Sequence, residues 1–204
     1  MSKYLFVSVC TFLSLLLGYP HHAEAKKMAP KELQLNPAAS SLEWVGTKKL
    51  GGRHMGKVTL KKGMVTFDGE NFLGGEIEID LASIEVTDIP KDNKDNQKLV
   101  THLKSDDFFG VDKYPTAKFV IKSAKKLTPK EYEFVGDLTI KGVTKPHTLR
   151  AEITMNDKET RATGTLKIDR TEFGIKYGSA NFFKLAADRV INNDFELKFN
   201  LVAQ

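Results

Sequence analysis

Cysteine is almost absent from this sequence, and metal-ligating residues are sparse. The single cysteine, Cys10, lies in an apolar segment near the N-terminus, so the rest of the chain has neither a disulfide nor a thiolate nucleophile. Five histidines are present, none with the His-Glu-x-x-His spacing of a zinc site. His102 and Asp106 lie one helical turn apart, but a solvated helix end capped by Ser105 and Asp106 is the simpler interpretation. The sequence predicts no metal site.

Groups arranged for catalysis are also missing. No serine lies in a Gly-x-Ser-x-Gly elbow. The adjacent carboxylates Asp106 and Asp107 point in different directions, which makes them a poor acid–base pair. His147 shares its parity with Leu149 and Ile153, so it could meet a polar head group, although a structural histidine is the simpler interpretation. We predict that the protein is not an enzyme.

Positive charge is scattered along the chain. The formal net charge is +5, from 31 Lys and Arg against 26 Asp and Glu. The lysine pairs stand among acidic residues, at Lys48-Lys49, Lys61-Lys62 and Lys125-Lys126. A nucleic-acid site needs a basic patch with aromatic or helical reading elements, and the sequence has neither. We expect no nucleic-acid partner, while transient contact with an anionic membrane surface stays open.

Residues 1–25 have the pattern of an export signal. Lys3 provides a short positive region, residues 4–18 form an apolar run, and Ala23-Glu24-Ala25 supplies small residues at a cleavage site. The alternative is an uncleaved anchor, but a span needs about 20 apolar residues, and this run is shorter and contains two serines and a threonine. We expect cleavage near Ala25 and a periplasmic or secreted protein.

Short segments of alternating apolar and polar residues fill the rest of the chain. After a flexible leader at 26–34, this period of two predicts about eight strands, at 41–48, 57–68, 76–84, 117–123, 134–140, 149–155, 162–169 and 195–201. A short helix is predicted at 97–104, and a second helical or loop segment at 181–187. Strands with one wet face can hide their edges by closing into a barrel. The prediction is an all-β, eight-stranded antiparallel barrel with one or two short helices, spanning 35–204.

One hairpin carries the clearest pattern. Phe134 and Leu138 alternate with polar residues before the segment 141–146, and Leu149 and Ile153 do so after it. A symmetric six-residue turn predicts these pairs: Phe134 with Ile153, Gly136 with Ala151, Leu138 with Leu149, Asp137 with Arg150, and Thr139 with Thr148. Periodicity alone leaves open whether the dry side is a filled core or an apolar cavity.

Four motifs, in order, resemble those of the YceI-like lipid/polyisoprenoid-binding family. Residues 102–109, with Lys113-Tyr114-Pro115 and Phe119, resemble its helix-to-strand marker, and 136–146 is similar to its hairpin marker. Residues 170–175 match its arginine-aromatic-glycine element, and His54-Met55-Gly56 its early histidine-glycine element. The family's opening strand usually carries a His-Ser pair, for which Ala39-Ser40 stands here.

The resemblance runs from about Leu35 to Ala203 and implies an exported, extended lipocalin-like barrel, often dimeric. Such a barrel would hold a long amphiphile in its lumen, such as a polyisoprenoid, an isoprenoid quinone or a fatty amide, as a bound lipid and not a catalytic cofactor. On this hypothesis the ligand-binding residues are Phe119, Ile121, Phe134, Leu138, Leu149, Ile153, Leu166 and Ile168, with Phe173, Phe182 and Phe183 near a mouth. A dry-barrel scaffold or accessory protein for a membrane redox or stress-response system is the alternative. An isoprenoid-processing enzyme has no residue set in its favour.

Overall fold

The computed structural model describes residues 29–68, 71–156 and 158–203, so the predicted signal and cleavage site lie outside the described residues. The elements in chain order are β1 (Lys31–Gln34), β2 (Ser41–Lys48), β3 (Arg53–Asp68), β4 (Asn71–Val86), α1 (Lys94–Lys104), β5 (Thr116–Lys126), β6 (Glu131–Ile140), β7 (Val143–Met155), β8 (Thr160–Asp169), the 3-10 helices η1 (Arg170–Phe173) and η2 (Ala187–Arg189), and β9 (Ile191–Ala203). No helix in these ranges is long and apolar enough to span a bilayer.

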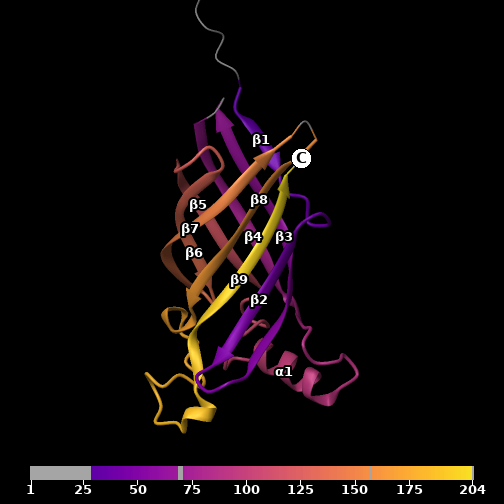
Figure 1. Ribbon diagram of the computed structural model, residues 1–204, viewed down its shortest axis with the longest axis vertical. Coiled ribbons are helices and arrows are strands. Elements are labelled where there is room, and N and C mark those ends of the chain that lie inside the picture. The colour runs from indigo at the N-terminus through magenta and orange to yellow at the C-terminus, as the bar shows by residue number, and fades with distance from the viewer. Residues whose placement is uncertain (1–28, 69–70, 157, 204) are drawn as a thin grey trace, which may run out of the picture.

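The strands form one antiparallel sheet that closes on itself (Figure 1). Around the barrel the order is β3-β2-β9-β8-β7-β6-β5-β4, and β4 pairs back with β3. β1 pairs with the far end of β3, placing Lys31 opposite Phe67, and a bridge from Leu35 to Ala203 joins this segment to β9. β1 therefore continues the position of β2 in the wall, within a stretch for which no element was predicted. The predicted eight-stranded barrel is confirmed.

Alternation along the strands separates the core from the surface. In β2, Leu42 and Trp44 are buried, while the intervening Glu43 is exposed. In β9, Leu197 and Phe199 are buried on either side of the exposed Lys198. Because successive strand side chains point to opposite faces, one apolar set from each strand meets inside the barrel.

The β6–β7 hairpin is tighter than predicted. Its turn is the two-residue Lys141-Gly142, with φ of 50° and 75°, and positive φ at both central residues is typical of a type I′ turn. The register therefore differs by four residues, and the observed pairs are Phe134–Leu149, Gly136–His147, Leu138–Lys145, Asp137–Pro146, Thr139–Thr144 and Glu133–Arg150. The five predicted pairs are wrong. An even shift leaves every residue on its predicted face.

One end of the barrel is covered by α1 and the segment that connects β8 to β9 (Figure 1). The side chain of Asn96 fixes α1 to the end of β4 by donating hydrogen bonds to the Val86 and Ile89 carbonyls, at 3.0 and 2.7 Å. After β8, Asp169 caps η1 by accepting from the Thr171 amide, and Gly174 ends it with φ of 76°. The segment predicted as helix or loop at 181–187 consists of turns that lead into η2.

Candidate ligand-binding lumen

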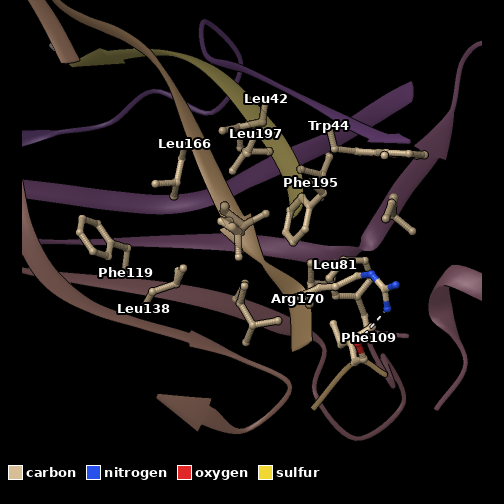
Figure 2. A pocket seen from close by; sticks show the side chains of 18 of the residues that line it. Leu42, Trp44, Leu81, Phe109, Phe119, Leu138, Leu166, Arg170, Phe195 and Leu197 are labelled. Carbon is tan, nitrogen blue, oxygen red and sulfur yellow. Dashed lines mark hydrogen bonds between the residues drawn. The ribbon is translucent and has the colours of Figure 1, made fainter. Parts of the chain in front are cut away.

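The barrel encloses an apolar cavity of about 150 Å³ that runs from the β5–β6 wall to the α1 end (Figure 2). Side chains from every strand from β2 to β9 line it, together with residues of α1, η1 and the loops at that end. An apolar cavity of roughly this volume holds a benzene ring. A long chain therefore requires inward-pointing aromatic side chains, such as those of Phe195 and Phe199, to change rotamer.

The structure brings most of the predicted lumen residues together. Five of them line the cavity: Phe119, Leu138, Leu149, Leu166 and Ile168. Ile121 is buried in the same core without reaching the cavity, and Phe134 and Ile153 pack half-buried against that core. The strand pattern therefore selected one continuous inner face.

The three residues predicted near a mouth do not line the cavity. Phe173 is completely buried in η1, with no exposed surface. Phe182 and Phe183 lie in the β8–β9 connection with exposed fractions of 46% and 50%, and neither lines the cavity. They belong to a surface loop beyond the closed end of the barrel.

Several lining residues were not among the predicted set. Those on strands follow the same alternation and could have been added from it: Leu42, Trp44, Val58, Ile77, Ile79, Leu81, Phe195, Leu197, Phe199 and Leu201. Leu103 of α1 and the adjoining Phe108 and Phe109 come from the covering segment, whose position over the lumen is set by long-range packing. Arg170 was noted only as part of the arginine-aromatic-glycine element at 170–175, and residue type alone does not predict that an arginine after a strand is buried in the lining.

Three glycines in the wall make room for aromatic rings. An ideal Cβ at Gly164 would lie 2.5 Å from Cζ of Phe199, and one at Gly136 would lie 3.0 Å from Cε2 of Phe119. Gly56 leaves space for Trp44 in the same way, with Cζ2 at 2.6 Å from the ideal position. Each ring lies against the bare backbone of its glycine. A side chain larger than hydrogen at these glycine positions would push the ring into the lumen.

A row of aromatic rings lies at the other end of the barrel. Phe67 and Phe72, on either side of the β3–β4 turn, have ring centroids 5.5 Å apart in an edge-to-face arrangement. Phe72 is 5.8 Å from Phe134 in the same arrangement, and Tyr132 stacks on Phe134 at 6.3 Å. Among the described residues, this end, remote from α1, is thus bounded by aromatic side chains.

Arg170 introduces a charge at the α1 end of the lumen. Its side chain has an exposed fraction of only 4% and lines the cavity. The guanidinium donates to three backbone carbonyls, those of Ile175 at 2.8 Å, Ile191 at 3.2 Å and Asn192 at 3.2 Å. Burial lowers the pKa of Arg170, which the negative charge of Asp169 partly opposes.

The remaining polar clusters are small and structural in form. His102 Nε2 lies 3.2 Å from Asp107 Oδ2, whereas Asp106 pairs with Lys113 at 2.6 Å, so the two residues weighed as metal ligands face different partners. His102 also contacts the ring of Tyr177 edge-on, with centroids 4.5 Å apart. The parts of the chain that the structure describes hold no group of three or more His, Cys, Asp or Glu arranged for a metal ion.

His147 lies at a seam in the barrel wall. β7 pairs with β8 only between Glu152–Met155 and Thr160–Thr163, so the ladder does not continue toward the α1 end. Across this seam, His147 Nε2 lies 3.3 Å from the carbonyl oxygen of Lys167. His147 does not line the cavity. Its contact favours the structural interpretation over a head-group ligand.

Solved structures share this architecture. The chain superposes on BcnA of Burkholderia cenocepacia with a TM-score of 0.67 and 22% identity, covering 83% of this chain and 99% of that one. It superposes on a polyisoprenoid binding domain from Saccharophagus degradans with a TM-score of 0.61 and 16% identity, covering 84% and 97%. At these identities the similarity establishes the fold alone.

Comparison with proteins of similar sequence identifies the family of this chain. A UPF0312 protein of Photorhabdus laumondii is 32% identical over 124 residues, which are 57% of this chain and 61% of that protein. Protein YceI of Shigella flexneri is 37% identical over 91 residues, 45% of this chain and 44% of that protein. The matched segments thus span about half the length of these relatives. The model of the YceI-like domain matches residues 33–203, and the protein therefore belongs to the YceI-like family.

Proposed function

We propose that this protein is a non-catalytic carrier that holds the apolar chain of a long amphiphilic lipid in its lumen. The observation that carries the proposal is the continuous apolar lining contributed by every strand from β2 to β9. The polyisoprenoid binding domain among the solved neighbours supports the same ligand class. A polyisoprenoid, an isoprenoid quinone or a fatty amide would satisfy it, as bound cargo and not as a cofactor.

The length of the ligand follows from the energetics of burial. Each methylene removed from water contributes about 0.8 kcal/mol, whereas association costs roughly 4–15 kcal/mol in lost freedom. A chain of about ten carbons is therefore needed before burial alone offsets a typical cost. A cavity of about 150 Å³ does not hold such a chain, so binding must widen the lumen by displacing aromatic side chains.

Trp44 provides a direct test of lumen binding. It is the only tryptophan of the chain, it lines the cavity, and its Nε1 donates to the Glu85 carbonyl at 3.1 Å. Titration of delipidated protein with an isoprenoid quinone, a quencher of indole fluorescence, is expected to quench Trp44 saturably at one quinone per barrel. Quenching that stays linear and unsaturated, as for free tryptophan, would reject an isoprenoid quinone as the ligand, and the same result with a fatty amide that carries a quenching bromine would reject the carrier function.

A dry scaffold is the second candidate function. The modest cavity and the inward rings of Phe195 and Phe199 favour it, because such a lumen can serve as an ordinary packed core. On this hypothesis the outer surface assists a membrane redox or stress-response system, and the delipidated protein takes up no quinone in the titration above.

We further propose that the carrier exchanges its lipid at an anionic membrane surface, through the aromatic loop defined by residues 176–189. This loop projects from the α1 end of the barrel (Figure 1) and exposes Phe182, Phe183 and Leu185. Lys176, Lys184 and Arg189 outnumber the single acid, Asp188. Exposed rings flanked by basic residues suit the interface of an anionic bilayer.

The proposal includes a cellular location and an oligomeric state. An export signal cleaved near Ala25 would direct the carrier to the periplasm or outside the cell. The resemblance to the family also implies a homodimer. Analytical ultracentrifugation tests the assembly, and N-terminal sequencing of the exported protein tests cleavage near Ala25.

A further inference from the structure

The guanidinium of Arg170 has unused hydrogen-bonding capacity inside the barrel. A guanidinium carries five N–H donors. Nε donates to the Asn192 carbonyl, Nη1 to that of Ile175 and Nη2 to that of Ile191. One N–H on each terminal nitrogen therefore has no acceptor among the residues of 29–203 that the structure describes. Both belong to a side chain that is 96% buried and lines the cavity.

The charge of Arg170 also lacks a counter-ion. None of the ion pairs within the described ranges includes it. The neighbouring Asp169 directs Oδ1 to the amide and hydroxyl of Thr171, at 2.8 and 2.6 Å, and Asp194 pairs with Lys167 at 2.8 Å. Carbonyl groups solvate the cation without neutralising it, and a buried unpaired charge is costly.

The position of Arg170 suits the head of an amphiphile. Figure 2 places it beside Phe109 at one end of the cavity, with Phe119 toward the other end. The lumen has apolar side chains between these residues. On the outer side, a surface cleft of about 450 Å³ shares Ile191, Asn192 and Asp194 with the wall of the cavity. Polar surface therefore adjoins the cavity wall at residues next to Arg170, since Ile191 and Asn192 accept hydrogen bonds from its guanidinium.

We propose that Arg170 is the head-group site of the lumen and binds a compact oxygen acceptor, a carboxylate or a carbonyl, at the end of a single apolar chain. This inference rests on the proposed carrier function and narrows its ligand class. The head lies at the α1 end and the tail extends toward Phe119 and the aromatic row beyond it. A carboxylate binds most tightly because it supplies the missing counter-charge as well as the acceptor.

A series of ligands with one tail and different heads tests the inference on the unaltered protein. Palmitate, palmitamide and hexadecane share a sixteen-carbon chain, and their affinities are compared by Trp44 fluorescence. Because a hydrogen bond to a charged group has a moderate net value, palmitate is expected to bind about 10- to 100-fold more tightly than hexadecane, with palmitamide between them. Equal affinities for the three would overturn the head-group site and leave the carrier function standing. No binding of any of them would overturn both.

Variants separate head-group binding from a structural role of Arg170. Arg170→Lys keeps the charge but loses the fork of donors, so the preference for palmitate over hexadecane, taken as the ratio of their affinities for the same variant, should fall several-fold. Arg161 on β8 is the matched control, because it bonds to Glu159 and Asn200 and does not line the cavity. Arg161→Lys should keep the full preference. A folded Arg170→Lys protein with the preference of the unaltered protein would contradict the proposal.

The orientation of the ligand gives a test that needs no variant. Trp44 lies near the Arg170 end of the cavity (Figure 2). A fatty acid brominated near its carboxylate should therefore quench Trp44 more strongly than one brominated at its terminal carbon. The reverse order, or equal quenching, would overturn the inferred orientation even if Arg170→Lys fails to fold.

Discussion

Phe199 lies directly across the β8–β9 ladder from Gly164, and its ring occupies the space that a side chain at position 164 would fill. Trp44 and Gly56 repeat this relationship on the β2–β3 ladder. In both pairs, a residue without a side chain lies opposite a large aromatic ring. On the proposed carrier function, the rings would have to leave these positions when a chain enters.

Gly164→Ala is expected to destabilise the protein and narrow the lumen. The added methyl would lie 2.6 Å from the Arg150 carbonyl oxygen as well as against Phe199, so the backbone or the ring must shift. Overpacking of this kind typically costs about 1–3 kcal/mol. Urea denaturation measures the loss, and the quinone titration measures the reduced affinity.

Gly46→Ala is the matched control, since Gly46 also borders the cavity but has no heavy atom within 4 Å of the ideal Cβ position. Its free energy of unfolding should change by less than about 0.5 kcal/mol. Equal effects of the two substitutions would show that the Phe199 ring does not need the space left by the missing side chain at Gly164.

Leu138→Lys is expected to abolish lipid retention. Leu138 is buried and lines the cavity, so the ammonium group would be forced into a predominantly apolar lumen. Val135→Lys, on the outward face of the same strand at 39% exposure, should retain lipid. Copurifying lipid is measured by organic extraction after circular dichroism has verified folding.

Ile153→Asp tests the same inner face near the other end of the barrel. Because Ile153 is only half-buried, this change costs less stability than a charge at Leu138. Full lipid retention in a folded Leu138→Lys or Ile153→Asp protein would contradict the assignment of this face to the ligand.

The inner face was predictable because alternation is a local signal. Leu138, Leu149 and Leu166 alternate with polar neighbours, and all three line the cavity. The hairpin register was not predictable in the same way. Lys141-Gly142 lacks the Asn-Gly or Asp-Gly pair that marks a type I′ turn, yet Lys141 adopts positive φ.

Burial of Arg170 and exposure of the aromatic loop depend on contacts between distant segments. Arg170 is buried because Ile191 and Asn192, some twenty residues later, return to supply carbonyl oxygens. Phe182 and Phe183 are exposed in the turns that follow Ser179, although Ile175 and Ser179 just before them are buried. Residue type and periodicity therefore predict neither the burial of Arg170 nor the exposure of Phe182 and Phe183.

The stability contributed by Asp88 should depend on pH. Burial tends to raise the pKa of Asp88, but hydrogen bonds from the Met55 amide at 2.9 Å and from His54 Nδ1 at 2.8 Å outweigh it, and the net pKa lies below the ordinary value. A lowered carboxyl pKa stabilises the fold above the unfolded pKa of about 3.9, and this stability is lost as the pH falls through the folded value.

Asp88→Asn should therefore lower the free energy of unfolding by about 1 kcal/mol at pH 7, with the difference from the unaltered protein shrinking below about pH 4. Asp92→Asn, at an exposed position in the same connection, is the control, and its free energy of unfolding at pH 7 should change by less than about 0.5 kcal/mol. Urea denaturation across the acid range measures both. A constant difference at all pH values would reject the role of the Asp88 carboxylate.

Phe182→Ser combined with Phe183→Ser is expected to weaken binding to anionic vesicles. The two rings supply the apolar part of the aromatic loop, while the lysines supply the attraction to charged lipid. Sedimentation with vesicles of phosphatidylglycerol and phosphatidylcholine should show a loss of about tenfold or more. Vesicles of phosphatidylcholine alone should bind both proteins weakly.

Met155→Ser is the control for this surface, since Met155 is 65% exposed and is the last residue of β7, which begins at the β6–β7 turn and ends away from α1 (Figure 1). Its binding to anionic vesicles should match that of the unaltered protein. If Met155→Ser is as damaging as the double change, the aromatic loop is not the docking surface.

Native mass spectrometry of the protein purified from its own compartment tests the carrier function most directly. If the protein is a lipid carrier, each barrel is expected to carry an added mass that disappears on organic extraction and is identified in the extract as one class of long-chain amphiphile. The folded Leu138→Lys protein should lack that mass. A homogeneous protein with no added mass, which also fails to take up isoprenoid quinone or fatty amide after delipidation, would contradict the carrier function and favour a dry scaffold.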